Sequence, residues 1–229
     1  MSKIAVTQQA TEPITARVEY AKRGRLRFIG HLDMARLITR AVRAARLPVR
    51  YTHGHSPHLD VSFGPALPLG TTGDSEYFDL RLAEPVEPGA VGEALGAHLP
   101  DGLEVRSVRL ITGKTASLGA WLNRADYTVR LPAGFELAPE EIERFLASER
   151  AVVVRRRGDR DKAVNVRRYV ERLEALDEPE GGTRLEMTLA ATPEGSTNPV
   201  EVLAALAGDA AARCPGMRVH RERLYHADG

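Results

Sequence analysis

Apolar and polar positions change their period several times along the chain. Residues 16–22 and 25–29 alternate as β-strands do, on either side of Gly24. From 31 to 47 the apolar residues recur at helical spacing, which predicts a helix that Pro48 ends. The next elements are predicted as strands at 49–52, 59–63, 76–83 and 103–111, a helix at 89–99, and a long Gly/Pro loop at 64–74.

The same order of elements returns in the second part of the chain. The pattern predicts strands at 126–131, 151–157, 183–192 and 217–226, with helices at 138–148 and 198–208. We therefore expect an α+β fold of two ferredoxin-like (βαββαβ) halves with antiparallel sheets. The expected boundaries are a disordered lead-in at 1–14, a first half at 15–111, a linker at 112–125 and a second half at 126–229.

Composition narrows the class of protein. Hydrophobic residues make up 43% of the 229 residues, enough to bury a core. No apolar run is long enough to cross a membrane, and the N-terminal residues do not resemble a signal peptide. Cys214 is the single cysteine, so the chain cannot form an internal disulfide or hold an iron–sulfur cluster through its own cysteines. We expect a soluble, cytoplasmic protein with no membrane partner and no cofactor.

Charge is distributed unevenly along the chain. The formal net charge is +1, yet residues 17–50 contain ten Lys or Arg and only two acids, a balance of +8. Arg36, Arg40 and Arg43 stand at i, i+4 and i+7 of the predicted helix, so they share a face opposite its apolar stripe. Arg25 and Arg27 precede the helix. A solvated charged face is the simplest interpretation, but this clustering favours a polyanion such as structured RNA, with no preference for DNA expected.

Histidines form a second group of candidate residues. His31 precedes the helix, and His53 and His55 flank Gly54 in a turn-rich loop. Three interpretations stay open: a metal site, acid–base catalysis by His31 or His53, and contacts with phosphates, bases or loop backbone. The third is favoured because no metal-binding signature accompanies the histidines. No phosphate-binding loop, dinucleotide fingerprint or nucleophile elbow is present either, so nothing in the sequence identifies an enzyme.

A stretch of the first half resembles a known family. It contains a Phe-x-x-His-Leu-Asp start, an Arg-rich helix, Leu-Pro, a Gly-x-x-Pro turn and a Pro-Leu-Gly loop. The matching residues are Phe28, His31, Leu32, Asp33, Arg36, Arg40, Leu47, Pro48, Gly54, Pro57, Pro68, Leu69, Gly70 and Glu76. The pattern resembles the radical-SAM-linked proteins of unknown function, over about residues 16–110, in the form that stands alone. Gly30 and His55 depart from it, standing where the family often has Ser and an aromatic residue.

The resemblance implies a separate radical SAM enzyme as a partner. More remotely, the arrangement is similar to the tandem ferredoxin-like endoribonucleases that process CRISPR RNA, a fold-level analogy that assigns no catalytic residue. The leading hypothesis is an RNA-binding module of the tRNA or rRNA class, accessory to an RNA-modifying or RNA-processing enzyme. Its site would comprise Arg25, Arg27, His31, Arg36, Arg40, Arg43, His53, Gly54 and His55. The alternatives are a metal-independent endoribonuclease and a protein-interaction subunit that binds no nucleic acid.

Overall fold

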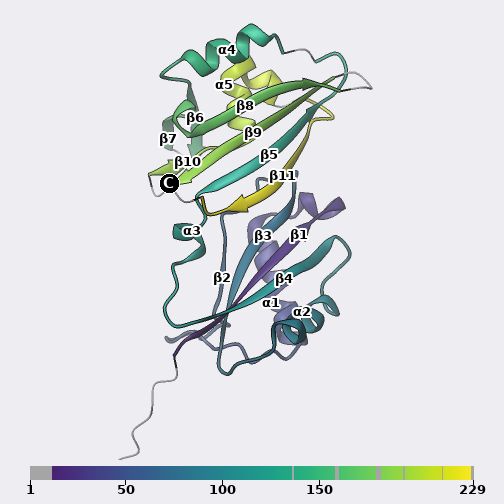
Figure 1. The fold of residues 1–229 in the computed structure, drawn as a ribbon, viewed down its shortest axis with the longest axis vertical. Helices are drawn as coiled ribbons and strands as arrows, with labels where there is room; N and C mark the ends of the chain where they lie inside the picture. The colour runs from purple at the N-terminus through teal and green to yellow at the C-terminus, as the bar shows by residue number, and fades with distance from the viewer. Residues whose placement is uncertain are drawn as a thin grey trace, which may run out of the picture.

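The computed structural model describes residues 12–135, 137–157, 160–178, 182–192, 194–212 and 214–227. Figure 1 shows strands and helices alternating in two halves along the long axis of the molecule. The first half contains β1 (Ile14–Lys22), the 3-10 helix η1 (Gly24–Phe28), α1 (His31–Ala44), β2 (Val61–Phe63), β3 (Thr71–Leu82), α2 (Pro88–Gly96) and β4 (Leu103–Thr112). The mixed α+β architecture with a mostly antiparallel sheet is the one that the sequence predicted.

The strands of the first half lie in the order β4-β1-β3-β2, and each neighbouring pair is antiparallel. Alternate residues of β1 and β3 are apolar, so each strand presents one apolar face. Val18 and Phe78 on that face are fully buried against Ile38 of α1 and Leu95 of α2. The two helices therefore cover one side of this half of the sheet.

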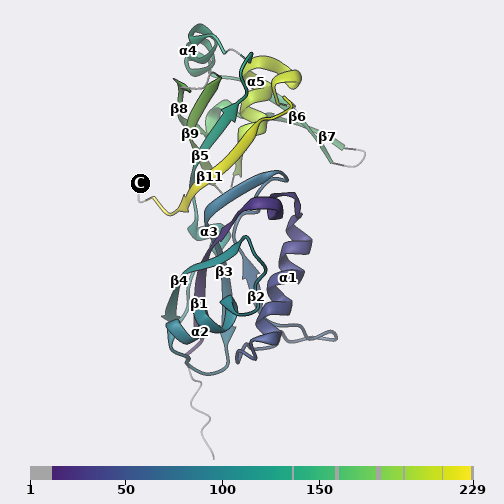
Figure 2. The ribbon, with the colours of Figure 1, turned by 90° about the vertical axis from the view of Figure 1, so that its right-hand side faces the viewer.

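The second half begins with a short helix. It contains α3 (Leu118–Trp121), β5 (Arg124–Leu131), α4 (Pro139–Ala147), β6 (Val152–Arg157), β7 (Arg160–Asn165), η2 (Arg167–Tyr169), β8 (Val170–Asp177), β9 (Thr183–Thr192), β10 (Gly195–Ser196), α5 (Pro199–Ala212) and β11 (Arg218–Tyr225). Strands β11, β5, β9 and β8 are neighbours in that order, all antiparallel. Phe145 of α4 and Leu203 of α5 pack on Val129 and Leu185 in its core. The β6–β7 hairpin pairs only with itself among the described strands and projects from the molecule (Figure 2).

One continuous sheet joins the two halves. β11 pairs with β3 in parallel, Val219 opposite Thr71, while its other edge pairs with β5. The prediction of separate antiparallel sheets thus needs a correction, because this junction places nine described strands in a single sheet. Tyr77 of β3 also belongs to the hydrophobic core of the second half.

The structure corrects the sequence prediction in several further places, and the strand predicted at 49–52 is present only as isolated bridges at Val49 and Tyr51. Residues 25–29 are not a strand: residues 24–28 form η1, because five alternating residues without a pairing partner do not specify β-structure. The predicted loop 64–74 ends early, since β3 begins at Thr71 and pairs there with β11. The predicted linker 112–125 contains α3, and β1 begins at Ile14. Residues 1–11 lie outside the described residues. Among the helices that are described, none has the length and apolar character needed to span a membrane.

Candidate nucleic-acid interface

Helix α1 is basic on its outer face and apolar on its inner face. Met34 and Ile38 point into the core with Ala41 and Val42, and all four are buried. Arg36, Arg40 and Arg43 are exposed on the outer face, as the helical spacing predicted. Figure 2 shows α1 lying along the side of the first half. Asp33 is exposed on this helix as well as the three arginines.

The arginines of the α1 region differ in their partners. Arg36 donates to the Asp33 carboxylate at 3.0 Å, an exposed pair one turn apart. For Arg40 and Arg43, and for Arg46 and Arg50 beyond the helix, no carboxylate of the described residues lies within ion-pair distance. A row of arginines is thus left without internal counter-charge, and its like charges repel one another weakly, a repulsion that an external anion would relieve.

Arg25 and Arg27 extend this row beyond the N-terminus of α1. Both belong to η1, where Arg25 is exposed and Arg27 is half-buried. The Arg27 guanidinium carbon lies 4.6 Å from the centroid of the Phe28 ring. The two residues were predicted as strand residues, but their candidate role depends on exposure and charge, which η1 provides. We use "arginine row" below for Arg25, Arg27, Arg40 and Arg43.

The candidate histidines lie at opposite ends of α1. His31 begins the helix, and its ring packs edge-on against Phe63 at 5.7 Å. His53, Gly54 and His55 lie in an exposed loop that follows the C-terminal end of the helix and is closed by a bridge between residues 51 and 59. Fourteen helical residues span about 20 Å. The helix thus lies between His31 and the segment that leads to His53, which gives no indication that the two form an acid–base pair.

The opposite face of the sheet is also charged, but most of its arginines are paired with carboxylates. Arg17 makes two 2.9 Å hydrogen bonds to the buried Asp79 carboxylate and stacks under Trp121 of α3. The other paired arginines on this face include Arg23 with Asp74, Arg172 with Glu174, Arg184 with Glu186 and Arg223 with Asp126. Each of these guanidinium groups already has a carboxylate. This face therefore attracts a polyanion less than α1 does.

A buried ionic cluster lies where the two halves meet. Arg221 of β11 is 2% exposed and donates through Nε to Glu76 Oε1 at 2.7 Å and through Nη2 to Glu76 Oε2. Arg221 Nη2 also donates to the Pro65 carbonyl at 2.8 Å. Burial disfavours the charge on Arg221, but the Glu76 carboxylate outweighs it and holds the pKa of Arg221 above its ordinary value. Lys22 lies nearby, and burial lowers the pKa of its ammonium group.

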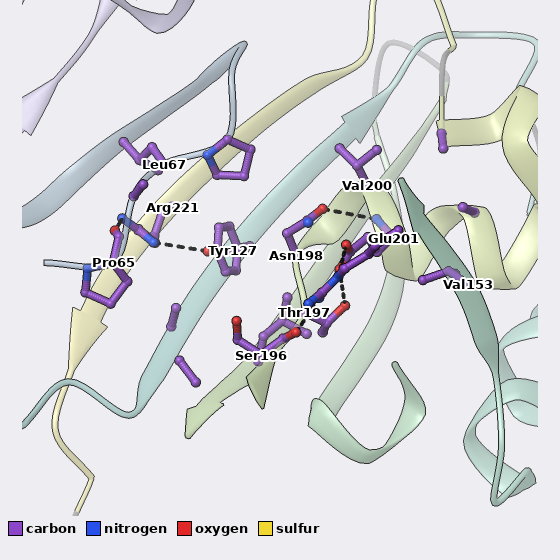
Figure 3. Close-up of a pocket in the computed structure, with 18 of the residues that line it drawn as sticks. Pro65, Leu67, Tyr127, Val153, Ser196, Thr197, Asn198, Val200, Glu201 and Arg221 are labelled. Atoms are coloured by element: carbon purple, nitrogen blue, oxygen red, sulfur yellow. Dashed lines mark hydrogen bonds and ion pairs between the residues drawn. The ribbon is translucent and has the colours of Figure 1, made fainter. Parts of the chain in front are cut away.

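A cleft of about 1030 Å³ opens beside this cluster (Figure 3). Pro65 and Leu67 line it on one side, and Val153 and Glu201 on the other. Arg155 also lines the cleft and donates hydrogen bonds to both carboxylate oxygens of Glu201, at 2.6 and 2.7 Å. The sequence did not reveal this cleft, because the residues named on its two sides are more than eighty positions apart.

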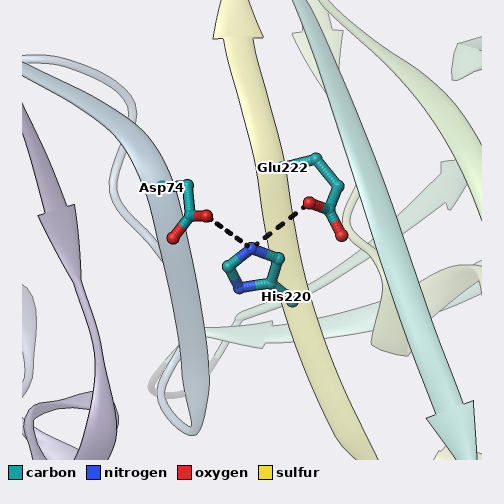
Figure 4. A group of neighbouring side chains, drawn as sticks. All are labelled: Asp74, His220 and Glu222. Atoms are coloured by element: carbon teal, nitrogen blue, oxygen red, sulfur yellow. Dashed lines mark ion pairs between the residues drawn. The ribbon is translucent and has the colours of Figure 1, made fainter.

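A second group that the sequence did not reveal lies on the paired face of the sheet. Asp74, His220 and Glu222 place their ligand atoms within 4.8 Å of one another (Figure 4). His220 Nε2 lies 3.6 Å from Asp74 Oδ2 and 3.4 Å from Glu222 Oε2. Such a set could hold a cation, but Arg23 already binds both Asp74 oxygens at 2.9 Å. The Arg23 guanidinium neutralises the carboxylate that a cation would need.

Comparison with known proteins gives a family but no activity. Residues 15–199 match the family of uncharacterized proteins conserved in bacteria, DUF2344, so the chain belongs to that family. A search of curated proteins found no match. A solved structure, the crystal structure of a Cbf5-Nop10-Gar1 complex, contains a similar chain with 9% sequence identity and a TM-score of 0.46. That similarity covers 93% of this chain and 50% of the other, so this chain spans half the length of that protein.

Proposed function

We propose that this member of the DUF2344 family is an RNA-binding module for structured RNA of the tRNA or rRNA class. The observation that carries the proposal is the arginine row, whose members lack internal carboxylates along an exposed helix. Arg40 and Arg43 would contact backbone phosphates, with Arg36 assisting them, and Arg25 and Arg27 would extend the track past the start of α1. The proposal includes no preference for DNA, because phosphate contacts alone do not distinguish nucleic acids.

A helix surface of this kind suits a polyanion better than a single small anion. Arg25 and Arg27 precede α1 and Arg40 and Arg43 lie in its C-terminal half, so a helix of about 20 Å separates the start of the row from its end. A nucleic-acid backbone presents several phosphates over such a length. Each neutralised phosphate releases condensed counterions, so the binding free energy depends on salt. His31 would lie at one end of the track, and His53, Gly54 and His55 at the other. In this proposal the histidines contact separate parts of the RNA.

Reversing charge on the helix tests the proposal. The double variant Arg40→Glu, Arg43→Glu should abolish binding of structured RNA at micromolar protein, measured by filter binding or fluorescence anisotropy. RNA binding by the wild-type protein should weaken steeply as the salt concentration rises. Single Arg→Gln variants at Arg40 or Arg43 should each reduce the slope of log binding constant against log salt concentration by about 1. Binding that does not respond to salt would exclude the phosphate contacts that we propose.

The chain offers a control with the same change in charge. Arg172→Glu with Arg223→Glu also replaces two exposed arginines, but both lie on the paired face of the sheet. This control should retain most of the affinity of the wild-type protein. An equal loss in both double variants would show that only the net charge of the molecule matters, and would contradict a site on α1.

We also propose that each half is a ferredoxin-like unit. In the first half the strands lie in the order β4-β1-β3-β2. α1 connects β1 to β2 and α2 connects β3 to β4, which gives two split βαβ units. In the second, β11-β5-β9-β8 repeats that order through α4 and α5, with the β6–β7 hairpin inserted.

The resemblance of residues 16–110 to radical-SAM-linked proteins supports a further proposal, that the module presents RNA to a separate radical SAM enzyme. Co-purification followed by mass spectrometry tests that partner.

A further inference from the structure

Three large apolar side chains are exposed beside the start of α1. Phe28 is 63% exposed, Leu32 72% and Leu69 69%. Leu69 comes from the loop before β3, and the next residue of that loop, Gly70, donates its backbone N–H to the Arg27 carbonyl at 2.8 Å. This hydrogen bond joins the loop to η1. We call Phe28, Leu32 and Leu69 the Phe28 patch. It contributes nothing to the core, so its exposure indicates contact with a ligand or partner.

The ring of Phe28 has the surroundings of a stacking platform. The guanidinium carbon of Arg27 lies over one face of the ring, 4.6 Å from its centroid, and Phe28 as a whole residue is 63% exposed. A nucleobase would stack on the face that Arg27 does not cover, while the guanidinium meets a neighbouring phosphate. Leu32 and Leu69 offer further apolar surface to a base.

The platform is held in place before any ligand binds. The buried Lys22 donates from Nζ to the Ile29 carbonyl at 3.0 Å, directly after Phe28. Arg23 N donates to the Gly102 carbonyl at 2.7 Å, which fixes the start of η1. A ligand therefore does not need to order this segment, and its binding loses less conformational entropy.

The charges around the patch favour RNA over a protein as the occupant. Arg25 and Arg27 adjoin it in η1, and the acid of α1, Asp33, is paired with Arg36, so the charge left uncompensated beside the patch is positive. The patch is also continuous with the arginine row, which the proposed function assigns to the RNA backbone. A base inside a duplex cannot stack on a side chain, since both of its faces are covered by its neighbours.

We propose that the Phe28 patch binds an unpaired nucleotide of the RNA, next to a helical stem that lies along α1. The inference rests on the proposed function and narrows its substrate class to RNA with a loop, bulge or single-stranded extension at a stem. Phe28 supplies the stacking face, Arg27 the adjoining charge, and Leu32 and Leu69 the apolar border.

Two RNA probes test the inference: a stem-loop and a blunt duplex with equal numbers of phosphates, titrated at the same salt concentration. The wild-type protein should bind the stem-loop more tightly. Phe28→Leu keeps an apolar side chain but loses the aromatic face, so it should weaken stem-loop binding about tenfold and leave duplex binding unchanged. Phe28→Trp should restore the preference for the stem-loop, and the fluorescence of the new indole should be quenched on binding.

Tyr51→Leu is the matched control, because Tyr51 is an exposed aromatic residue beyond the other end of α1. It should keep the preference for the stem-loop. If Phe28→Leu and Phe28→Ala bind both probes as the wild type does, the inference is overturned. If the protein binds neither probe at micromolar concentration, the proposed function fails, and this inference fails with it. Equal binding of both probes that is still lost in Arg40→Glu, Arg43→Glu retains the proposed function and overturns only the stacking site.

Discussion

Arg221 connects parts of the molecule that are distant in the sequence. Its guanidinium reaches Glu76 and the Pro65 carbonyl in the first half, and the Tyr127 hydroxyl at 3.3 Å in the second. Removing one member of a buried ion pair leaves the other charge without compensation. We therefore expect Glu76→Gln to lower the free energy of unfolding by about 3–5 kcal/mol, measured by urea denaturation.

A control separates this effect from the general loss of an ion pair. Arg172→Gln breaks the exposed pair with Glu174 and should leave the free energy of unfolding nearly unchanged. The double variant Glu76→Leu, Arg221→Met removes both buried charges and should recover much of the loss. Equal effects of Glu76→Gln and Arg172→Gln would contradict the buried geometry.

Asp74 gives the protein a pH-dependent contribution to stability. The side-chain hydrogen bonds from Arg23 hold the pKa of the Asp74 carboxyl below its ordinary value. The unfolded chain therefore binds a proton at a higher pH than the folded chain does. This contribution is present above the ordinary carboxyl pKa of about 4 and is lost as the pH falls through the lower folded-state value.

We expect the stability of Asp74→Asn to fall less steeply below about pH 4 than that of the wild type. Urea denaturation at a series of pH values measures this slope. Arg23→Gln should flatten the acid limb in the same way, because it removes the donor. If Arg23→Gln retains the wild-type slope, then Arg23 is not what lowers the pKa of Asp74.

At the scale of the element, η1 depends on the turn that precedes β4. Gly102 has φ +92°, and a Cβ at this position would lie 2.8 Å from the Arg23 carbonyl oxygen. Gly102→Ala thus combines a strained backbone with a clash against backbone, and should cost about 1–3 kcal/mol in thermal or urea unfolding. Gly96→Ala at the end of α2 meets no atom within 4 Å and should not destabilise the protein. If Gly102→Ala leaves the free energy of unfolding unchanged, this turn does not hold the start of η1 in place.

The sequence predicted the elements whose periodicity continues over several turns or residues. α1 follows from an apolar stripe of four turns, and its exposed arginines follow from the same spacing. The strand predicted at 25–29 was wrong, because η1 and a short strand share an alternating pattern when no neighbour is known. The extension of β3 to Thr71 depends on pairing with β11, a partner far along the chain. Local patterns cannot indicate such a partner.

The residues of the candidate site also divide into those that local sequence patterns predict and those that depend on distant parts of the chain. Exposure of Arg36, Arg40 and Arg43 was predictable, since it needs only the helix. The burial of Arg221 was not, because arginine is usually exposed and its partner Glu76 lies 145 residues away. The separation of His31 from His53 likewise required knowing that the helix between them runs straight along the sheet.

At the scale of the whole molecule, the continuous sheet should make the two halves unfold together. β11 hydrogen-bonds to both β3 and β5, and Tyr77 of the first half is part of the second core. A chain of this size need not unfold in one step, and two independent halves would unfold separately. Leu80 and Leu185 are fully buried in the two different cores. Either one replaced by Ala should lower the free energy of unfolding by about 2–5 kcal/mol.

Hydrogen exchange read by mass spectrometry distinguishes joint from separate unfolding. If the halves are coupled, Leu80→Ala in the first core should reduce amide protection in β9 as well as in β1, and Leu185→Ala should do the same in reverse. Far-UV circular dichroism and Trp121 fluorescence should also report one urea midpoint, since Trp121 packs on Tyr77 across the junction at 6.0 Å. Loss of protection confined to the half that carries the substitution would show that the β11–β3 junction does not couple the two cores.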